Sequence, residues 1–432
     1  MKKNLSTHSN KRVLVVGTTS DYIDWIRKAC PDRALFLTAP RIRETALEDR
    51  PTDQEEILAP LTDISQIKST LMHHLEQWDQ TLSGVACFDC ESMELTSMLA
   101  SEYGLAYPSL DAIRLCRDKY ISKQIWQKNN IPCPSTRPVN LPDEVIQFHA
   151  MTQSTVVIKP FCGSGSELVF RCKTIKDCQD AFVAVKDGLK KRAANTLFKQ
   201  TRSQDYLMVV EEFIDGPEYS CDFMIENDEI TIIRMTRKIK SANQPFGTIT
   251  GYLIPSRLPG KLEQSKLEQS KLENILLNGA RCLGIKRGLC MVDFIVNGHQ
   301  IMLIEMTPRP GGDCLPFLLK ESGNLDILKL TLDVAEQKLL KLNGSIPFAP
   351  HIAIRIHAQK AGVLKGFNTD LLRDDKRIKQ LYFIRKPGHV ITMPPYDYDS
   401  WLLGHMIIEP SDNDYPETQC LLIAKRLGVD IE

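Results

Sequence analysis

Two carboxylates interrupt stretches of sequence that otherwise have the composition of buried strands. Asp293 lies within MVDFIV and Glu305 lies within IMLIEM. A charge inside such an apolar run costs free energy unless it is paired or binds a metal ion. Two oxygen ligands suit Mg²⁺, which also takes phosphate oxygens from a substrate. The alternative is a structural ion pair with the neighbouring Arg309 or with a lysine.

The turn between these two segments decides whether the carboxylates share a face. With a two-residue Asn-Gly turn, Val296 would face His299, and the two carboxylates would lie on opposite faces of the hairpin. A three-residue loop at 297–299 would pair Val296 with Gln300 and bring both carboxylates to one face. A metal site therefore predicts either the longer loop or a β-bulge, and a tight two-residue turn would argue against it.

A lysine precedes a glycine- and serine-rich run in VVIKPFCGSGSELVF, residues 156–170. A P-loop places its lysine after the glycines, so that motif is excluded. Backbone N–H groups of such a loop can still bind phosphate oxygens, and Lys159 at the end of a strand adds a positive charge for them. A glycine-rich hairpin can also close over a ligand. A plain β-hairpin with a structural lysine is the alternative.

A third segment, VVEEFIDGPEYSCDF at 209–223, combines an apolar strand with paired acids, a glycine and a further glutamate. The backbone at the strand end, from Glu211 to Ile214, could pair with a nucleotide base. Glu218 could accept hydrogen bonds from ribose hydroxyls. Neither feature is specific by itself.

The elements that must position these residues change character along the chain. In the first part, strands alternate with helices, which predicts a parallel sheet. Four prolines in IPCPSTRPVNLP, residues 131–142, then predict a boundary. Beyond it we expect a small α+β module. The predicted strands are 12–16, 34–38, 84–88, 155–159, 167–171, 207–213, 219–225, 229–235, 289–296 and 300–306.

Two segments give less regular patterns. Residues 111–130 read as one helix. KLEQSKLEQSKLEN, residues 261–274, is a tandem repeat of period five, so its leucines cannot form one apolar stripe on a helix. We expect an exposed insertion or a helix extension there, with the helix proper running from Leu272 to Gly284.

The composition of the chain excludes several classes of protein. The 432 residues include 54 Lys+Arg and 54 Asp+Glu, and this balance favours neither a nucleic-acid partner nor a membrane surface. No apolar segment has the length of a signal peptide core or a membrane span. The 13 cysteines are an odd number scattered through a long chain, which is typical of reduced thiols. We therefore expect a cytoplasmic protein.

Five segments in a fixed order resemble the ATP-grasp superfamily. They are DK at 118–119, IKPFCGSGS at 158–166, VVEEFIDGPEYS at 209–220, VDF at 292–294 and IEMTPRPGG at 304–312. The resemblance is strongest over about 112–340. The C-terminal segments HIAIRIHAQKAGVLKGF and LLGHMII look like the biotin carboxylase-like branch, and within it the chain looks closest to carboxylate–amine ligases that join amino acids.

The resemblance implies an α/β and α+β multidomain fold. Its expected parts are a pre-ATP-grasp Rossmann-like domain at 1–112, an ATP-grasp domain at 113–340 and a C-terminal α+β subdomain at 341–432. A small lid subdomain is expected at about 150–213.

The resemblance also implies roles for single residues. Lys119 and Lys159 would hold ATP phosphates, under a loop formed by Gly163, Ser164, Gly165 and Ser166. Glu211, Glu212, Phe213 and Ile214 would frame the adenine, and Glu218 would bind the ribose. Asp293, Glu305 and Thr307 would bind Mg²⁺, although many members have Glu and Asn in place of Asp293 and Thr307. Arg309 would face the acyl phosphate or a substrate carboxylate, with Lys238 and Arg355 as further candidates for that charge.

The implied activity is an ATP-dependent ligation of a carboxylate to an amine through an acyl phosphate, with Mg²⁺, or Mn²⁺ as its substitute. Small-molecule substrates, amino acids above all, are the expected partners, and the resemblance implies a homodimer. One alternative is a carboxylase that activates bicarbonate, against which the sequence R-P-G-G-D after the metal glutamate argues. The other is a non-catalytic nucleotide-binding protein.

Overall fold

The chain folds into two compact units, which are described separately. The computed structural model describes residues 10–193, 195–198, 208–241, 243–256, 258, 266–338, 346–411 and 414–432. The first unit comprises Met1–Ile113 and Asp326–Lys341, and the second comprises Arg114–Leu325 and Leu342–Glu432. Together they have the mixed α/β and α+β multidomain architecture that the sequence predicts.

The first unit is built on a four-stranded parallel sheet with strand order β3-β2-β1-β4. Its strands are almost wholly apolar because helices and sheet bury them together, as expected for a parallel sheet. The elements in chain order are β1 (Lys11–Val16), α1 (Ser20–Ala29), β2 (Ala34–Thr38), α2 (Pro40–Thr45), β3 (Glu56–Leu58), α3 (Ile64–Gln77), β4 (Thr81–Ala86) and α4 (Met93–Glu102).

Helix α11 (Ile327–Ala335) also belongs to the first unit, although it is distant in sequence. It packs on β4 and α1. Arg33, just before β2, is ion-paired with Asp333 at 2.5 Å and with Glu336 at 2.6 Å. The sequence-based division placed this segment in the middle domain, because contiguity along the chain was its only guide.

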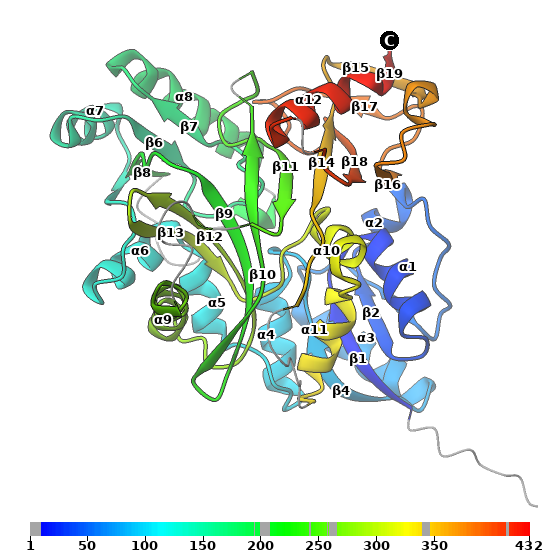
Figure 1. Cartoon of the computed structure of the whole chain (residues 1–432). Coiled ribbons are helices and arrows are strands. Elements are labelled where there is room, and N and C mark those ends of the chain that lie inside the picture. Colours follow the sequence, from blue (N-terminus) through cyan, green and yellow to red (C-terminus); the bar gives the residue numbers. More distant parts are fainter. Residues whose placement is uncertain are drawn as a thin grey trace, which may run out of the picture. The chain divides into compact units, whose positions relative to one another are not determined.

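The second unit is organised around an eight-stranded antiparallel sheet with strand order β13-β12-β9-β10-β11-β14-β18-β16 (Figure 1). Its strands are β9 (Glu218–Glu226), β10 (Glu229–Lys240), β11 (Ile249–Ile254), β12 (Gly288–Asn297), β13 (Gln300–Thr307), β14 (His351–His357), β16 (Ile378–Phe383) and β18 (Leu402–Ile408). The adjacent pairing of β9, β12 and β13 is what later brings Glu218, Asp293 and Glu305 together.

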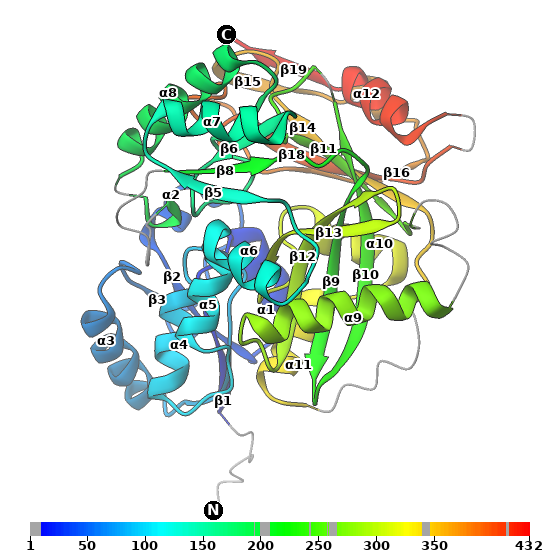
Figure 2. The ribbon, with the colours of Figure 1, turned by 90° about the vertical axis from the view of Figure 1, so that its left-hand side faces the viewer.

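Two helices cover one face of this sheet, α6 (Lys119–Lys128) and α9 (Lys266–Cys282) (Figure 2). Trp126 of α6 is fully buried, and its indole N–H donates to the carbonyl of Gly279 in α9 at 3.1 Å. Leu276 of α9 belongs to the same apolar core as Phe223 and Phe294 of the sheet. Helix α6 is therefore fixed to the strands that carry the carboxylates.

The helices depart from the sequence prediction in two places. The stretch 111–130 is not one helix, because Asp118 has an extended backbone and caps α6, which separates it from α5 (Leu110–Arg117). Helix α9 begins at Lys266 rather than at Leu272, so the second half of the KLEQS repeat extends the helix. The repeat's first half lies outside the described residues.

A small four-stranded sheet, β5-β8-β6-β7, forms a lid subdomain with helices α7 (Pro142–Thr152) and α8 (Ile175–Lys191). Both helices pack on the sheet's strands and on each other (Figure 1). The strands are β5 (Thr136–Val139), β6 (Val156–Lys159), β7 (Phe170–Cys172) and β8 (Met208–Glu212). The lid therefore starts near residue 136, earlier than the predicted 150.

The remaining elements of the second unit are α10 (Leu315–Gly323), β15 (Gly362–Asn368), β17 (Val390–Ile391), α12 (Pro416–Arg426) and β19 (Gly428–Ile431). The C-terminal elements share an apolar core with β14 and β18 of the large sheet. Within the part of the chain that the structure describes, no helix is both long enough and apolar enough to cross a membrane.

Candidate active site

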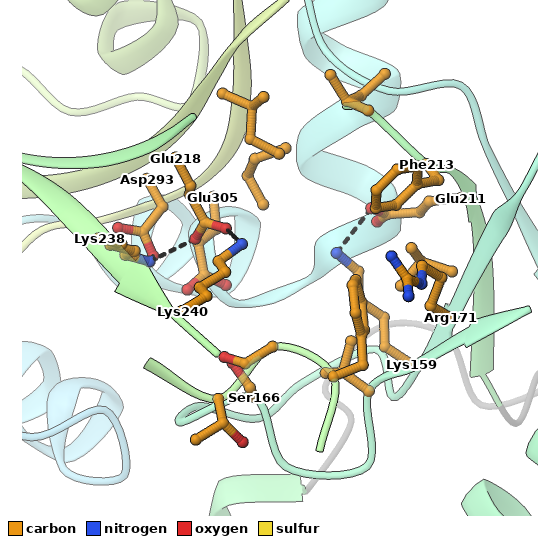
Figure 3. A pocket seen from close by; sticks show the side chains of 18 of the residues that line it. Lys159, Ser166, Arg171, Glu211, Phe213, Glu218, Lys238, Lys240, Asp293 and Glu305 are labelled. Carbon is orange, nitrogen blue, oxygen red and sulfur yellow. Dashed lines mark hydrogen bonds and ion pairs between the residues drawn. The ribbon is translucent and has the colours of Figure 1, made fainter. Parts of the chain in front are cut away.

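A cavity of about 530 Å³ in the second unit collects most of the residues that the sequence singled out (Figure 3). Its walls come from α6, the lid strands, the glycine-rich loop, the β10–β11 loop and the strands β9, β10, β12 and β13. The predicted residues that line it are Lys119, Lys159, Gly163, Ser164, Gly165, Ser166, Glu211, Glu212, Phe213, Ile214, Glu218, Lys238, Asp293 and Glu305.

The β12–β13 hairpin sets Asp293 directly opposite Glu305. Asn297 pairs with Gln300, so the turn has two residues, Gly298 and His299, and the expected three-residue loop is wrong. A β-bulge at Ile304 shifts the register between Phe294 and Asp293, and this shift brings the two carboxylates to one face. The bulge, which was the other arrangement compatible with a metal site, is therefore the one that occurs.

Asp293 is buried and only partly satisfied. Its Oδ2 accepts a hydrogen bond from Lys238 Nζ at 2.6 Å, and Lys238 also donates to Glu218 at 2.7 Å. Its Oδ1 is buried without a hydrogen-bond partner among the described residues. Burial, together with repulsion from Glu305 and Glu218, raises the pKa of Asp293 to about 6 despite the pairing with Lys238.

The geometry of this carboxylate pair fits a magnesium ion. Asp293, with its unpartnered Oδ1, and the half-buried Glu305 line one cavity (Figure 3). Among the described residues no group of three or more His, Cys, Asp and Glu is arranged for a metal ion. Mg²⁺ is commonly bound by one or two carboxylates and completed by phosphate oxygens and water. Thr307 follows on the same strand, facing Met291, but does not line the cavity.

Lys159 and Glu211 form the other charged group of the cavity. Lys159 Nζ lies 2.7 Å from Glu211 Oε2, and both side chains are almost fully buried. The second oxygen of Glu211 lies 3.0 Å from Lys123 Nζ. Burial lowers the pKa of Lys159 to about 8, and repulsion from Lys123 and Lys119 adds to this, while Glu211 opposes it. Lys159 thus lies at the end of β6 in a buried group of two lysines that share one glutamate.

Lys119 links α6 to the glycine-rich loop. Asp118 caps the helix by accepting hydrogen bonds from the backbone of Tyr120 and Ile121, which makes Lys119 the first helical residue. Lys119 Nζ donates to the carbonyl of Gly163 at 2.9 Å and lies 3.6 Å from Glu305 Oε2. It therefore stands between the loop and the carboxylate pair.

The loop from Gly163 to Ser166 contains residues with a positive φ. Gly165 lies at φ +67° and Ser166 at φ +61°, in the left-handed region that glycine enters without strain. Ser166 Oγ donates to the carbonyl of Gly247, in the β10–β11 loop, at 2.8 Å. The lid is thus tied to the large sheet by a direct hydrogen bond across the cavity.

Aromatic rings close another side of the cavity. The rings of Phe213 and Phe246 lie 6.1 Å apart, and the guanidinium of Arg171 lies 5.7 Å from the first ring and 5.4 Å from the second. Figure 3 shows Arg171 and Phe213 beside Lys159 and Glu211, away from the group around Asp293. A flat apolar ligand group would find its partners at this end, and an anionic group would find them near the lysines.

Arg309 and Arg355 do not line this cavity. Arg309 follows β13 and donates to the carbonyl of Pro310 at 2.7 Å. Arg355, on β14, is ion-paired with Asp313 at 2.6 Å. The short segment from Arg309 to Asp313 is held at Gly311, whose N–H donates to a carboxylate oxygen of Asp222 at 3.0 Å.

Asp222 is itself fixed by Arg234. The two side chains are fully buried and form two hydrogen bonds, of 2.8 and 2.9 Å. Buried charges require such pairing, and Arg is suited to bidentate contact with a carboxylate. This pair secures the backbone that follows Arg309.

Sequence reasoning missed several residues around the cavity. Lys240 also pairs with Glu218, and the guanidinium of Arg171 lies over the aromatic rings. Lys123 carries a charge yet lies fully buried behind the cavity. Its position four residues after Lys119, on the same face of α6, was the one available signal.

Comparisons with known proteins agree with this geometry. The family model of the ATP-grasp domain matches residues 152–316, which include the glycine-rich loop, β8 and the carboxylate hairpin. Over these residues the chain is similar to the ATP-grasp domain. This confirms the resemblance stated from the five segments, at the level of the superfamily.

Curated ATP-grasp relatives are distant. The D-alanine–D-alanine ligase of Acidovorax ebreus is 22% identical over 218 residues, 48% of this chain and 59% of that protein. The L-arginine-specific L-amino acid ligase of Bacillus subtilis is 19% identical over 286 residues, 66% of this chain and 64% of that protein. The chain thus spans less than two thirds of each.

Solved structures show that the ATP-grasp fold extends over nearly the whole chain. The L-amino acid ligase of Bacillus licheniformis superposes with a TM-score of 0.75 at 17% identity, covering 99% of this chain and all of that one. Biotin carboxylase of Campylobacter jejuni superposes with a TM-score of 0.67 at 14% identity, covering 97% and 92%. At such identities the likeness concerns the fold.

Proposed function

We propose that this protein is an ATP-dependent carboxylate–amine ligase that acts on amino acids. The observation that carries the proposal is the single cavity in which two opposed carboxylates, two lysines and a glycine-rich loop meet. These are the groups that phosphoryl transfer requires, because its catalysis rests on positioning and on charge stabilisation. The names of the relatives, which ligate D-alanine or L-amino acids, support the substrate class.

The nucleotide would lie with its base toward Phe213 and its phosphates toward Lys119 and Lys159. The backbone between Glu211 and Ile214 would pair with the base edge, and Glu218 would bind the ribose. The loop from Gly163 to Ser166 would cover the phosphates with its N–H groups. Each of these residues lines the cavity, which supports the assignment.

Asp293 and Glu305 would hold Mg²⁺, which when bound would spread the negative charge of the phosphates. Lys119 and Lys159 would offset further charge on the γ-phosphate, so that a substrate carboxylate can attack its phosphorus. The products of that step are an acyl phosphate and ADP. An amine then attacks the acyl carbon, loses a proton and expels phosphate. The lid would keep water from the acyl phosphate.

The residues that would hold the acyl phosphate or a substrate carboxylate are less directly supported. Lys238 lines the cavity beside Asp293, which favours it. Arg309 follows the metal glutamate by four residues, and Arg355 is joined to the same backbone segment through Asp313. We propose that these three cations serve the substrates rather than the nucleotide.

Phosphate release from ATP and Mg²⁺ tests the proposal. The purified protein is supplied with amino acids singly and in pairs, and with bicarbonate in a separate well. We expect release that requires a pair of amino acids and yields an amide by mass spectrometry. Lys159→Ala and Glu305→Ala should each reduce the rate by about 100-fold or more, because each removes a charge that stabilises the transferring phosphate.

Other outcomes would contradict the ligase. Release with bicarbonate alone would assign the protein to the carboxylases. Binding of ATP without release in any well would instead indicate a nucleotide-binding protein without this activity.

A further inference from the structure

A fully buried lysine connects the two halves of the cavity from behind. Lys123, on α6, has no exposed surface and does not line the cavity. Its Nζ lies 3.0 Å from Glu211 Oε1 and donates to the carbonyl of Ile304 at 2.8 Å. A charged side chain at such a depth is rare and needs partners that compensate for lost hydration.

The first partner determines the charge that the cavity presents. Glu211 is shared between Lys123 and Lys159, one lysine on each carboxylate oxygen. Glu211 and Lys159 alone would form a pair without net charge, and such a pair attracts phosphate weakly. With Lys123 the three side chains carry one net positive charge, and of the two lysines only Lys159 lines the cavity.

The second partner determines the geometry of the carboxylate hairpin. Ile304 is the extra residue of the β-bulge, so its carbonyl faces away from the regular pairing of β12 and β13. Lys123 accommodates that carbonyl by donating to it. The ammonium group of Lys123 thus contacts Glu211, which pairs with Lys159, and also the backbone carbonyl just before Glu305.

We propose that Lys123 is a positioning residue, which neutralises Glu211 so that Lys159 keeps its charge for phosphate and which anchors the bulge that aligns Asp293 with Glu305. This inference rests on the proposed function, because it takes the ligand of Lys159 to be a polyphosphate. Lys123 acts through Glu211 and Ile304 and does not contact the ligand.

The test compares the affinities for ADP and for adenosine at pH 7 with Mg²⁺, by titration calorimetry. Both ligands carry the base, but only ADP carries phosphates, so the ratio of the two affinities reports the charge at Lys159. Lys123→Met should lower this ratio about tenfold and leave adenosine affinity unchanged. Lys123→Met combined with Glu211→Gln should recover the ratio to within about threefold of wild type. In the double variant Lys159 is no longer paired with a negatively charged Glu211, so the phosphates again meet one net positive charge.

Two results would overturn the inference. One is an unchanged ratio in Lys123→Met, and the other is a double variant no better than the single one. A role in folding alone would lower both affinities together, which also contradicts it. If Lys123→Met does not fold, Lys123→Gln keeps a donor for the Ile304 carbonyl and carries the same expectation.

A control separates this inference from the proposed function. Lys159→Met should lose the preference for ADP. If wild type and Lys159→Met bind ADP equally, or wild type does not bind it, the nucleotide site is wrong and the inference falls with it. If Lys159→Met loses the preference but Lys123→Met keeps it, the nucleotide site stands and only the role of Lys123 is wrong.

Discussion

Each of two glutamates in the cavity is held by two lysines. Glu211 contacts Lys123 and Lys159. Glu218 contacts Lys238 and Lys240, as Figure 3 shows. Burial alone would raise the pKa of Glu218, but these two lysines hold it down at about 2. The ionised Glu218 orients Lys238 and Lys240, and its single negative charge offsets only one of their two positive charges. The cavity is thereby prepared for an anionic ligand.

A buried histidine outside the cavity predicts how stability depends on pH. His405, on β18, packs against the rings of Phe317 at 4.6 Å and Tyr382 at 5.5 Å, and its Nε2 has no hydrogen-bond partner among the residues that the structure describes. Burial lowers the pKa of His405 from 6.5 to about 4, and Arg355 adds to this while Asp313 opposes it. Between about pH 6.5 and pH 4, His405 is therefore protonated in the unfolded chain but neutral in the folded chain. As a consequence, the free energy of unfolding decreases as the pH falls through this range.

His405→Phe should remove that part of the acid sensitivity, because phenylalanine keeps an aromatic ring and cannot be protonated. Urea unfolding at several pH values between 8 and 4 measures it. Between pH 8 and pH 4 the free energy of unfolding should decrease in both proteins. The decrease should be smaller in the variant than in wild type, by up to about 3 kcal/mol. Parallel pH profiles would show that His405 is not neutral in the folded protein.

At the residue scale, the sequence indicated most of the side chains that meet in the cavity. Asp293, Glu305 and Lys159 stood out because each is a charge at or within an apolar strand. Lys123 did not, since a lysine on a predicted helix is most often exposed. Its burial depends on the packing of α6 against β5 and α9 and on the contacts of Lys123 with Glu211 and Ile304, which no local pattern records.

At the element scale, apolar runs located the strands that carry the carboxylates, but β3, β5 and β11 were not predicted, and neither was the position of the backbone irregularities. Lys123 donates to the carbonyl of Ile304 at the bulge, and Lys119 N–H donates to the carbonyl of Phe161 beside the break at Asp118, so each irregularity involves a contact far apart in sequence. Both irregularities have chemical consequences, because the first aligns the carboxylates and the second places Lys119. Sequence reasoning could state that a bulge or a longer loop was needed, but could not choose between them.

The cap of α6 gives a prediction at this scale. Asp118→Ala removes the acceptor for the N–H groups of Tyr120 and Ile121 and should cost about 1 kcal/mol of stability. Because Lys119 is the next residue, ADP affinity should fall as well, by several-fold in calorimetry. Asp118→Asn is the matched control, since asparagine caps helices about as well as aspartate. If Asp118→Asn binds ADP as poorly as Asp118→Ala, charge and not the cap is responsible.

At the scale of the whole molecule, the fold class could be predicted from the sequence, but the unit to which α11 belongs could not. That helix follows α10 directly in sequence, yet it packs with β4 and α1 and carries the acids that pair with Arg33. The boundary could not be read from composition, because both sides of it are apolar helices. A segment that packs with a distant part of the chain, as α11 does, can be assigned to its unit only when the tertiary contacts are known.

The division into two units predicts where a nucleotide will stabilise the protein. The described residues that line the cavity all belong to the second unit. ADP at a hundredfold its Kd should stabilise that unit by about 2.7 kcal/mol, which slows hydrogen exchange through its unfolding about 100-fold. Amides of β6, β8, β12 and β13 should therefore gain protection by mass spectrometry, while those of β1 and β2 exchange as before. Lys159→Met at the same ADP concentration should lose the effect. Equal protection of β1 and β2 would mean that the two units unfold as one.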